Sequence, residues 1–141
     1  MIDAMTAPYT AAVLRWFLGI MFIAHAFLKW RVLTMQTTVA MFRSLGLPGW
    51  FAYLVTVVEL IGGGCLIAGI APRYAALLLI PLIVGTIVAV HGKNGWEFTN
   101  KGGRWEFPAF WAAALLFQFL IGDGAWTLLP SPTLSSVIAA L

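Results

Sequence analysis

The stretch WFAYLVTVVELIGGGCLIAGI at residues 50–70 decides the fold, because it is long enough to cross a lipid bilayer and carries a single charge. A transmembrane helix needs about 20 mostly apolar residues. Every residue of this stretch except Glu59 is apolar, small or hydroxyl-bearing. A lone charge inside a bilayer costs from ~2.5 to more than ~10 kcal/mol, so such a residue is usually paired and usually functional. The stretch therefore predicts a membrane-spanning helix in which Glu59 has a partner.

The rest of the chain has the composition of a multi-pass membrane protein. Of its 141 residues, 62% are hydrophobic and 9% are charged, and the mean hydropathy is +0.95. Soluble domains carry about 25% charged residues. We predict an all-α membrane protein with one domain, residues 1–141, in which four transmembrane helices form a bundle. The expected spans are residues 10–28, 50–70, 74–90 and 107–121.

The connection between the first two spans has the pattern of an amphipathic helix. Apolar residues recur at helical spacing from Val32 to Leu45, polar residues lie between them, and Gly46 and Pro48 end the pattern. A helix of this kind lies in the membrane interface with its apolar face towards the lipid. We therefore expect a short interfacial helix between the first and second spans.

The positive charges predict how the chain is oriented. The first and third connections contain Lys29, Arg31, Arg43, Lys93, Lys101 and Arg104, whereas the opposite side has Arg73 alone. Loops rich in lysine and arginine face the cytoplasm. We predict that these two connections are cytoplasmic and that both termini lie outside, in a cell (inner) membrane. Cations beside membrane ends contact lipid headgroups, so the lipid bilayer is an expected partner and nucleic acid is not.

Arg15 lies inside the first span and is the first candidate partner for Glu59. At ~1.5 Å per helical residue, Glu59 is about 13 Å from one end of its span and Arg15 about 20 Å from the corresponding end of the first span. An extended arginine side chain can bridge that difference in depth. We predict a buried Arg15–Glu59 ion pair between the first two spans. Its role is either to fix the register of the helices or to make Glu59 a proton-accepting or ligand-binding carboxylate.

Other polar residues gather at one membrane end, namely His25, Lys29, His91 and Glu106. His25 and Lys29 are one helical turn apart, so they share a face, and with Arg15 they form a polar stripe that must look into the bundle. Three interpretations are open for this group. The side chains could reach lipid headgroups or water, they could bind the headgroup of an amphipathic ligand such as a quinone, or His25, His91 and Glu106 could bind a metal ion.

The quinone interpretation gives each residue a chemical task. A quinone needs hydrogen-bond donors for its carbonyl groups and a group that exchanges protons when its oxidation state changes. Histidine is the side chain that most readily exchanges protons near neutral pH, so His25 and His91 are candidates for that task, and Lys29 would stabilise a reduced oxyanion. We take His25, Lys29, His91 and Glu106 as ligand-binding candidates, and Glu59, His25 and His91 as catalytic candidates. We assign no metal ion, because the sequence lacks a paired spacing such as His-x-x-x-His.

The order and spacing of these residues resemble the DoxX family of small four-helix membrane proteins. The resemblance rests on Arg15, Gly19, His25, Lys29, Gly46-Leu47-Pro48, Glu59, Gly62, Gly63, Gly69, Arg73, His91, Gly102-Gly103, Glu106, Gly122 and Gly124. It implies a four-helix bundle with inward-facing polar residues, similar to subunits of quinone-linked oxidoreductases, including a thiosulfate:quinone oxidoreductase, or to companions of thiol-redox and oxidative-stress proteins. The chain departs from the family at Trp126–Leu129, where a Ser-Leu-Asp-like ending is usual.

Two functions of different classes follow. The first is an accessory membrane subunit of a quinone-linked oxidoreductase or redox-stress system. The second is a non-catalytic subunit that anchors or assembles a larger complex. Cys65 is the one cysteine, so the chain forms no internal disulfide or dithiol relay. We expect no covalently bound cofactor, and either a protein partner or a homo-oligomer. Solute transport is disfavoured, because four helices are few and the halves show no inverted repeat.

Overall fold

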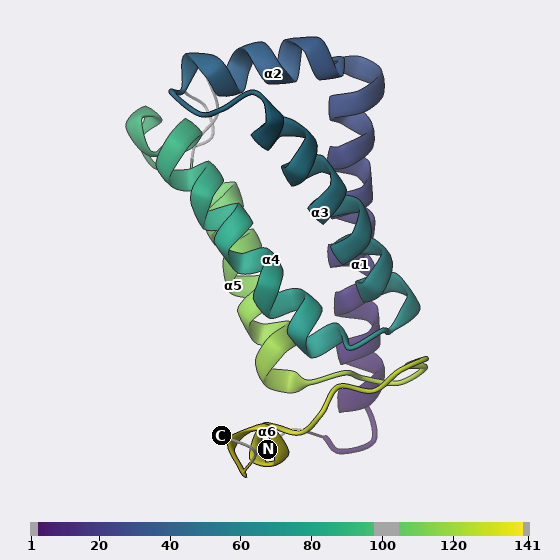
Figure 1. Cartoon of the computed structure of the whole chain (residues 1–141). Helices are drawn as coiled ribbons and strands as arrows, with labels where there is room; N and C mark the ends of the chain where they lie inside the picture. The colour runs from purple at the N-terminus through teal and green to yellow at the C-terminus, as the bar shows by residue number, and fades with distance from the viewer. Residues whose placement is uncertain (1–2, 98–104, 140–141) are drawn as a thin grey trace.

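The structure is a computed structural model that describes residues 3–97 and 105–139, and these residues are mainly helical (Figure 1). The elements are α1 Ala7–Phe27, the π-helix η1 Leu28–Val32, α2 Met35–Ser44, α3 Trp50–Ala68, α4 Pro72–Thr86, the π-helix η2 Ile87–His91, the 3-10 helix η3 Gly92–Asn94, α5 Glu106–Ile121 and α6 Leu134–Ala139. Within the described ranges, the β-pairing is a single isolated bridge between Ile70 and Leu129.

Three helical segments are long and apolar enough to cross a membrane. They are Ala7–Val32, Trp50–Ala68 and Pro72–Asn94, and they confirm the first three predicted spans. The fourth predicted span coincides with α5, a shorter apolar helix of 16 residues. The all-helical class is thus confirmed, whereas a fourth crossing of the membrane stays a prediction.

The helices pack as two antiparallel pairs, α1 with α3 and α4 with α5 (Figure 1). Gly19 on α1 faces Gly63 on α3 so closely that a Cβ atom added to Gly19 would lie 2.7 Å from the Gly63 carbonyl oxygen. Small residues of this kind let helix backbones approach in a membrane, where packing replaces the hydrophobic driving force. Between the pairs lies a core that includes Phe22, Leu79 and Leu115. In Figure 1 the pairs diverge towards the end where α2 lies.

Helix α2 lies across the ends of the spans at that side (Figure 1). Thr34 precedes it at a φ of 65°, and its hydroxyl accepts a hydrogen bond from the Thr37 amide at 3.4 Å. Thr38 is buried, while the neighbouring Gln36 and Thr37 are exposed. The helical part of the predicted amphipathic segment is therefore confirmed, and its location in the membrane interface stays a prediction.

The opposite end is closed by the segment that follows α5. Its backbone bonds to two other parts of the chain. The Ala125 amide donates to the Pro8 carbonyl of α1 at 2.8 Å; in the α3–α4 connection, the Leu129 amide donates to the Gly69 carbonyl at 3.0 Å and the Ala71 amide donates to the Leu129 carbonyl at 2.8 Å. Within the described ranges, Arg73 marks this end and Lys29, Arg31, Arg43 and Lys93 belong to elements at the α2 end. Lys101, Gly102, Gly103 and Arg104 lie outside the described residues, and the orientation stays a prediction.

Candidate functional site

Arg15 is fully buried but is not the partner of Glu59, so the predicted ion pair is wrong. The Arg15 guanidinium instead donates four hydrogen bonds to backbone carbonyls. Nη1 bonds to Leu66 at 2.7 Å and Ile67 at 2.8 Å, and Nη2 bonds to Ala125 at 2.9 Å and Trp126 at 2.7 Å. Arg15 therefore fastens the last turn of α3 to the segment that closes the bundle.

Helix geometry explains this correction. Gly19 on α1 and Gly63 on α3 lie at the same level. The two helices are antiparallel, so Glu59, four residues before Gly63, lies level with Ile23, four residues after Gly19. Arg15 is then eight residues, about 12 Å, from the level of Glu59. Side chains on a helix also point towards its N-terminus, so the Arg15 side chain extends away from Glu59. It reaches the carbonyls at the C-terminus of α3, which have no partner within their helix and attract a cation.

Lys29 is the ionic partner of Glu59. Its Nζ contacts Glu59 Oε1, and the two side chains are 16% and 4% exposed, respectively. Lys29 lies in η1, closer to the membrane end than Glu59, and its side chain extends back along α1 as the N-terminal tilt requires. The second carboxylate oxygen of Glu59, Oε2, is buried and has no hydrogen-bond partner within the described part of the chain. The pair thus leaves one strong acceptor available.

His25 lies near this ion pair, and Trp111 packs against His25. The His25 ring is 4.8 Å from the Trp111 ring, and Phe22 is 4.5 Å from the same indole. His25 Nδ1 is 2.9 Å from the Met21 carbonyl oxygen. A carbonyl only accepts, so Nδ1 carries the hydrogen and Nε2 of the neutral ring is left as an acceptor. Trp111 Nε1 is a buried donor with no partner in the described ranges. His25 is also near enough to Glu59 for an electrostatic interaction.

His91 and Glu106 have no described bond to this group. His91 ends η2, its ring is partly buried, and its Nδ1 has no hydrogen-bond partner among the described residues. Glu106 begins α5 and is partly buried. No described hydrogen bond or ion pair joins either residue to Glu59 or Lys29. In residues 3–97 and 105–139, no three histidine, cysteine or acidic side chains lie close enough together to hold a metal ion.

Sequence reasoning missed Trp111 and the local geometry around Lys29 and His91. Both of these polar residues lie in π-helical turns, η1 and η2, which continue α1 and α4. Short π-helical segments occur often at functional sites. Trp111 was hidden because an apolar helix contains many aromatic residues, and a buried indole N–H without a partner is visible only in three dimensions.

We use the name Glu59 cluster for Glu59, Lys29, His25 and Trp111. Its atoms offer a carboxylate acceptor, an ammonium, an imidazole that can exchange a proton, and an indole donor. All four side chains come from helices that pack together in an apolar environment, where an unpaired polar atom is costly. The cluster can therefore bind a small polar group that both donates and accepts hydrogen bonds.

These features define the class as a helical membrane protein with buried charges between its spans. A family model then fixes the family: residues 10–92 match the DoxX model, which is more than half of the chain, and the chain belongs to the DoxX family. The resemblance noted in the sequence is thereby confirmed. The matched region includes Arg15, His25, Lys29, Glu59 and His91, whereas Trp111 lies beyond it.

The chain is also similar to a protein of Bacillus subtilis (strain 168) named "Putative oxidoreductase CatD". The identity is 36% over 81 residues, which is 57% of this chain and 59% of the relative. The match thus spans less than two thirds of the relative's length. No solved structure matches the chain significantly.

Proposed function

We propose that this DoxX protein is a four-helix membrane subunit of a quinone-linked oxidoreductase or redox-stress system, and that the Glu59 cluster binds the headgroup of a quinone. The observation that carries the proposal is the pair of orphaned atoms there. Glu59 Oε2 is a buried acceptor without a donor, and Trp111 Nε1 is a buried donor without an acceptor. Buried polar atoms are almost always hydrogen-bonded, so each exception needs an explanation. A bound ligand that supplies both partners is such an explanation.

The chemistry of a quinone fits the groups in the cluster. A quinone carbonyl accepts a hydrogen bond, which the Trp111 indole can donate. A quinol hydroxyl donates one, which Glu59 Oε2 can accept. His25 lies against Trp111, and its Nε2 can take up or release a proton as the ring changes oxidation state. Lys29 stabilises negative charge on a reduced oxygen. His91 and Glu106 remain proposed outer contacts near the membrane end.

The subunit role rests on what the chain brings to electron transfer. Two electrons must enter or leave a bound quinone, and a single cysteine cannot form an internal dithiol. We therefore place the electron donor or acceptor in a partner chain. In this proposal α5 is the fourth span. Its 16 residues cover about 24 Å at ~1.5 Å per residue, somewhat less than the ~30 Å hydrocarbon core, and local thinning of the bilayer accommodates such a difference.

The named relative supports the redox assignment as far as its printed name goes. It is called an oxidoreductase, and the region it shares with this chain is a little over half of each protein. The alternative of an anchoring subunit would use the same bundle without a ligand. It predicts that substitution of Glu59 or Trp111 does not change the binding of any small molecule.

A binding titration separates these functions. Purified protein in nanodiscs is titrated with a tail-less naphthoquinone, and binding is followed by quenching of tryptophan fluorescence and by calorimetry. We expect saturable binding that weakens by about tenfold or more in Trp111→Phe and in Glu59→Gln. The first variant loses the indole hydrogen bond to the ring, and the second loses the charge-assisted one. His25→Ala should also weaken binding, because it removes the imidazole that packs against Trp111.

Asp123→Asn is the matched control. It neutralises a carboxylate whose partner is Ser131, at the other end of the bundle, with the Ser131 amide at 2.5 Å. It should bind like the wild type. If the wild-type protein shows no saturable binding, or if Glu59→Gln and Trp111→Phe bind as tightly as it does, the quinone proposal is wrong and the anchoring function remains.

A further inference from the structure

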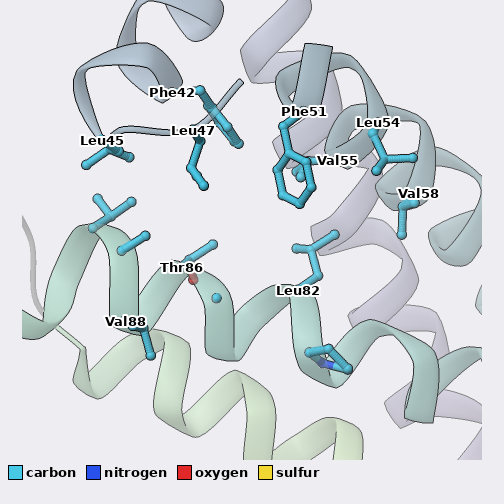
Figure 2. A pocket seen from close by; sticks show the side chains of 14 residues that line it. Phe42, Leu45, Leu47, Phe51, Leu54, Val55, Val58, Leu82, Thr86 and Val88 are labelled. Carbon is cyan, nitrogen blue, oxygen red and sulfur yellow. The ribbon is translucent and has the colours of Figure 1, made fainter. Parts of the chain in front are cut away.

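An apolar groove of about 490 Å³ lies between two parts of the chain at the α2 end (Figure 2). One wall comes from α2 and α3, with Phe42, Phe51 and Leu54 among its side chains. The other wall comes from α4 and η2, with Pro81, Gly85 and Ala89. Figure 2 shows the larger side chains of the first wall above the ribbon of α4. A volume of this size is within the range of small-molecule sites.

The groove is hollow because one face of α4 and η2 carries little bulk. Pro81, Gly85 and Ala89 follow one another at intervals of four residues, so they lie on one face. A Cβ atom added to Gly85 would meet no other atom within 4 Å. The facing wall has phenylalanine and leucine side chains, yet these do not fill the space. Empty space of this kind between helices loses packing contacts, and an occupant would restore them.

The lining selects a hydrocarbon as the occupant. Thr86 carries the one polar side chain among the residues that line the groove. Its hydroxyl already donates to the Ile83 carbonyl at 2.7 Å. The groove thus offers no free hydrogen-bonding side chain to a polar molecule, and a headgroup placed there would lose its partners. Two of its walls belong to segments that can span the membrane, Trp50–Ala68 and Pro72–Asn94, so a chain from the bilayer can reach it without crossing water.

The α3 wall leads, in sequence, to a polar residue with an orphaned atom. The lining part of α3 ends at Val58, and the next residue is Glu59, whose Oε2 has no described partner. The lining part of η2 ends at Val90, next to His91, but α3 and α4 are antiparallel, so His91 lies at the other end of the groove, near α2. A ligand with a polar head at the Glu59 cluster and an apolar tail could use both regions.

We infer that this groove binds the prenyl side chain of the quinone whose headgroup occupies the Glu59 cluster. The inference rests on the proposed function and adds the substrate class, a quinone with a long isoprenoid tail that arrives laterally from the bilayer between α3 and α4. Since the tail leaves one apolar medium for another, the hydrophobic effect contributes nothing and the gain is close packing.

The test compares two probes that share a ring, a tail-less naphthoquinone and the same ring with a long polyprenyl chain. Affinities are measured in nanodiscs and expressed per mole of lipid, so that partitioning of the tail into the bilayer cancels. We expect the prenylated ring to bind about tenfold more tightly to the wild type. Gly85→Leu and Ala89→Leu fill the groove and should remove that difference while leaving the tail-less ring unaffected.

Gly64→Leu is the matched control. Gly64 is also a glycine of a spanning helix whose added Cβ would meet no atom within 4 Å, but it does not line the groove. It should preserve the tenfold preference. Native mass spectrometry of the same discs shows whether a phospholipid stays bound.

The outcomes separate this inference from the proposed function. If both probes bind equally and Gly85→Leu changes neither, while Glu59→Gln weakens both, the headgroup site stands and the tail groove is refuted. If a phospholipid is retained by the wild type, is lost in Gly85→Leu and is not displaced by the prenylated quinone, the groove is a lipid site and the inference is also wrong. If neither probe binds to the wild type, both proposals fail.

Discussion

Replacement of Arg15 by methionine should destabilise the closed end of the bundle more than any single surface change. Methionine keeps most of the volume of the arginine stem but removes all four hydrogen bonds to Leu66, Ile67, Ala125 and Trp126. The Leu66 carbonyl bond is fully buried and the others are partly buried. Each buried carbonyl left without a donor costs about 1–3 kcal/mol.

The expected magnitude follows from these contacts. The Leu66 carbonyl contributes about 1–3 kcal/mol. The Ile67 carbonyl adds less because it keeps the Trp16 indole as a donor, and the two carbonyls of the closing segment add less because water can reach them. Removal of a buried guanidinium also recovers part of its desolvation cost, which is several kcal/mol. We expect a net loss of about 2–3 kcal/mol in the free energy of unfolding. The free energy of unfolding of Arg15→Lys should fall between those of the wild type and Arg15→Met, because an ammonium cannot span two pairs of carbonyls.

The assay is reversible unfolding in mixed micelles, followed by far-ultraviolet circular dichroism, together with amide hydrogen exchange. Exchange should accelerate in Arg15→Met at Ala125 and Leu129, whose amides bond to Pro8 and Gly69. Trp16→Phe is the control, since Trp16 Nε1 donates to the same Ile67 carbonyl at 3.1 Å from an exposed position. It should cost less than about 1 kcal/mol. Unchanged exchange in Arg15→Met, together with a loss below ~1 kcal/mol in its free energy of unfolding, would refute the role of Arg15 in holding α3 to the closing segment.

Two further predictions concern the ion pair and the backbone. Lys29→Met should lower the free energy of unfolding by about 3–5 kcal/mol, because it leaves Glu59 charged and buried without its partner. The double variant Lys29→Met/Glu59→Gln should recover most of that loss. Additive losses in the unfolding titration would show that the two side chains are not coupled. Ala71→Gly should stabilise the protein by about 0.5 kcal/mol. Ala71 has a φ of +42°, so glycine relieves ~1–2 kcal/mol of left-handed backbone strain. Its greater freedom in the unfolded chain costs about 0.4–1 kcal/mol. A lower melting temperature in Ala71→Gly would contradict this account.

The membrane spans could be read from the sequence because they depend on composition and length alone. Residues 50–70 contain one charge in a stretch long enough to cross the bilayer, and the helix α3 covers Trp50–Ala68. The amphipathic pattern between Val32 and Leu45 likewise gave α2 to within a few residues. The need for a partner at Glu59 was also clear, since a buried charge demands one.

The identity of that partner was decided by the tertiary structure. Pairing depends on how far one helix slides along another, and the contact between Gly19 and Gly63 sets that offset. At this offset the side chain of Lys29 extends back to Glu59, and the side chain of Arg15 extends away from it. Arg15 also bonds to backbone carbonyls, which every residue possesses and which no residue pattern can single out.

The candidate site, too, could be predicted from the sequence only in part. The sequence identified His25, Lys29 and Glu59 as polar residues that must avoid the lipid. The contact of His25 with Trp111 and the orphaned atoms of Glu59 and Trp111 emerged only once helices from distant parts of the chain lay side by side. Hydropathy is a property of one segment, whereas a site is a property of the distances between several, and those distances exist only in the folded bundle.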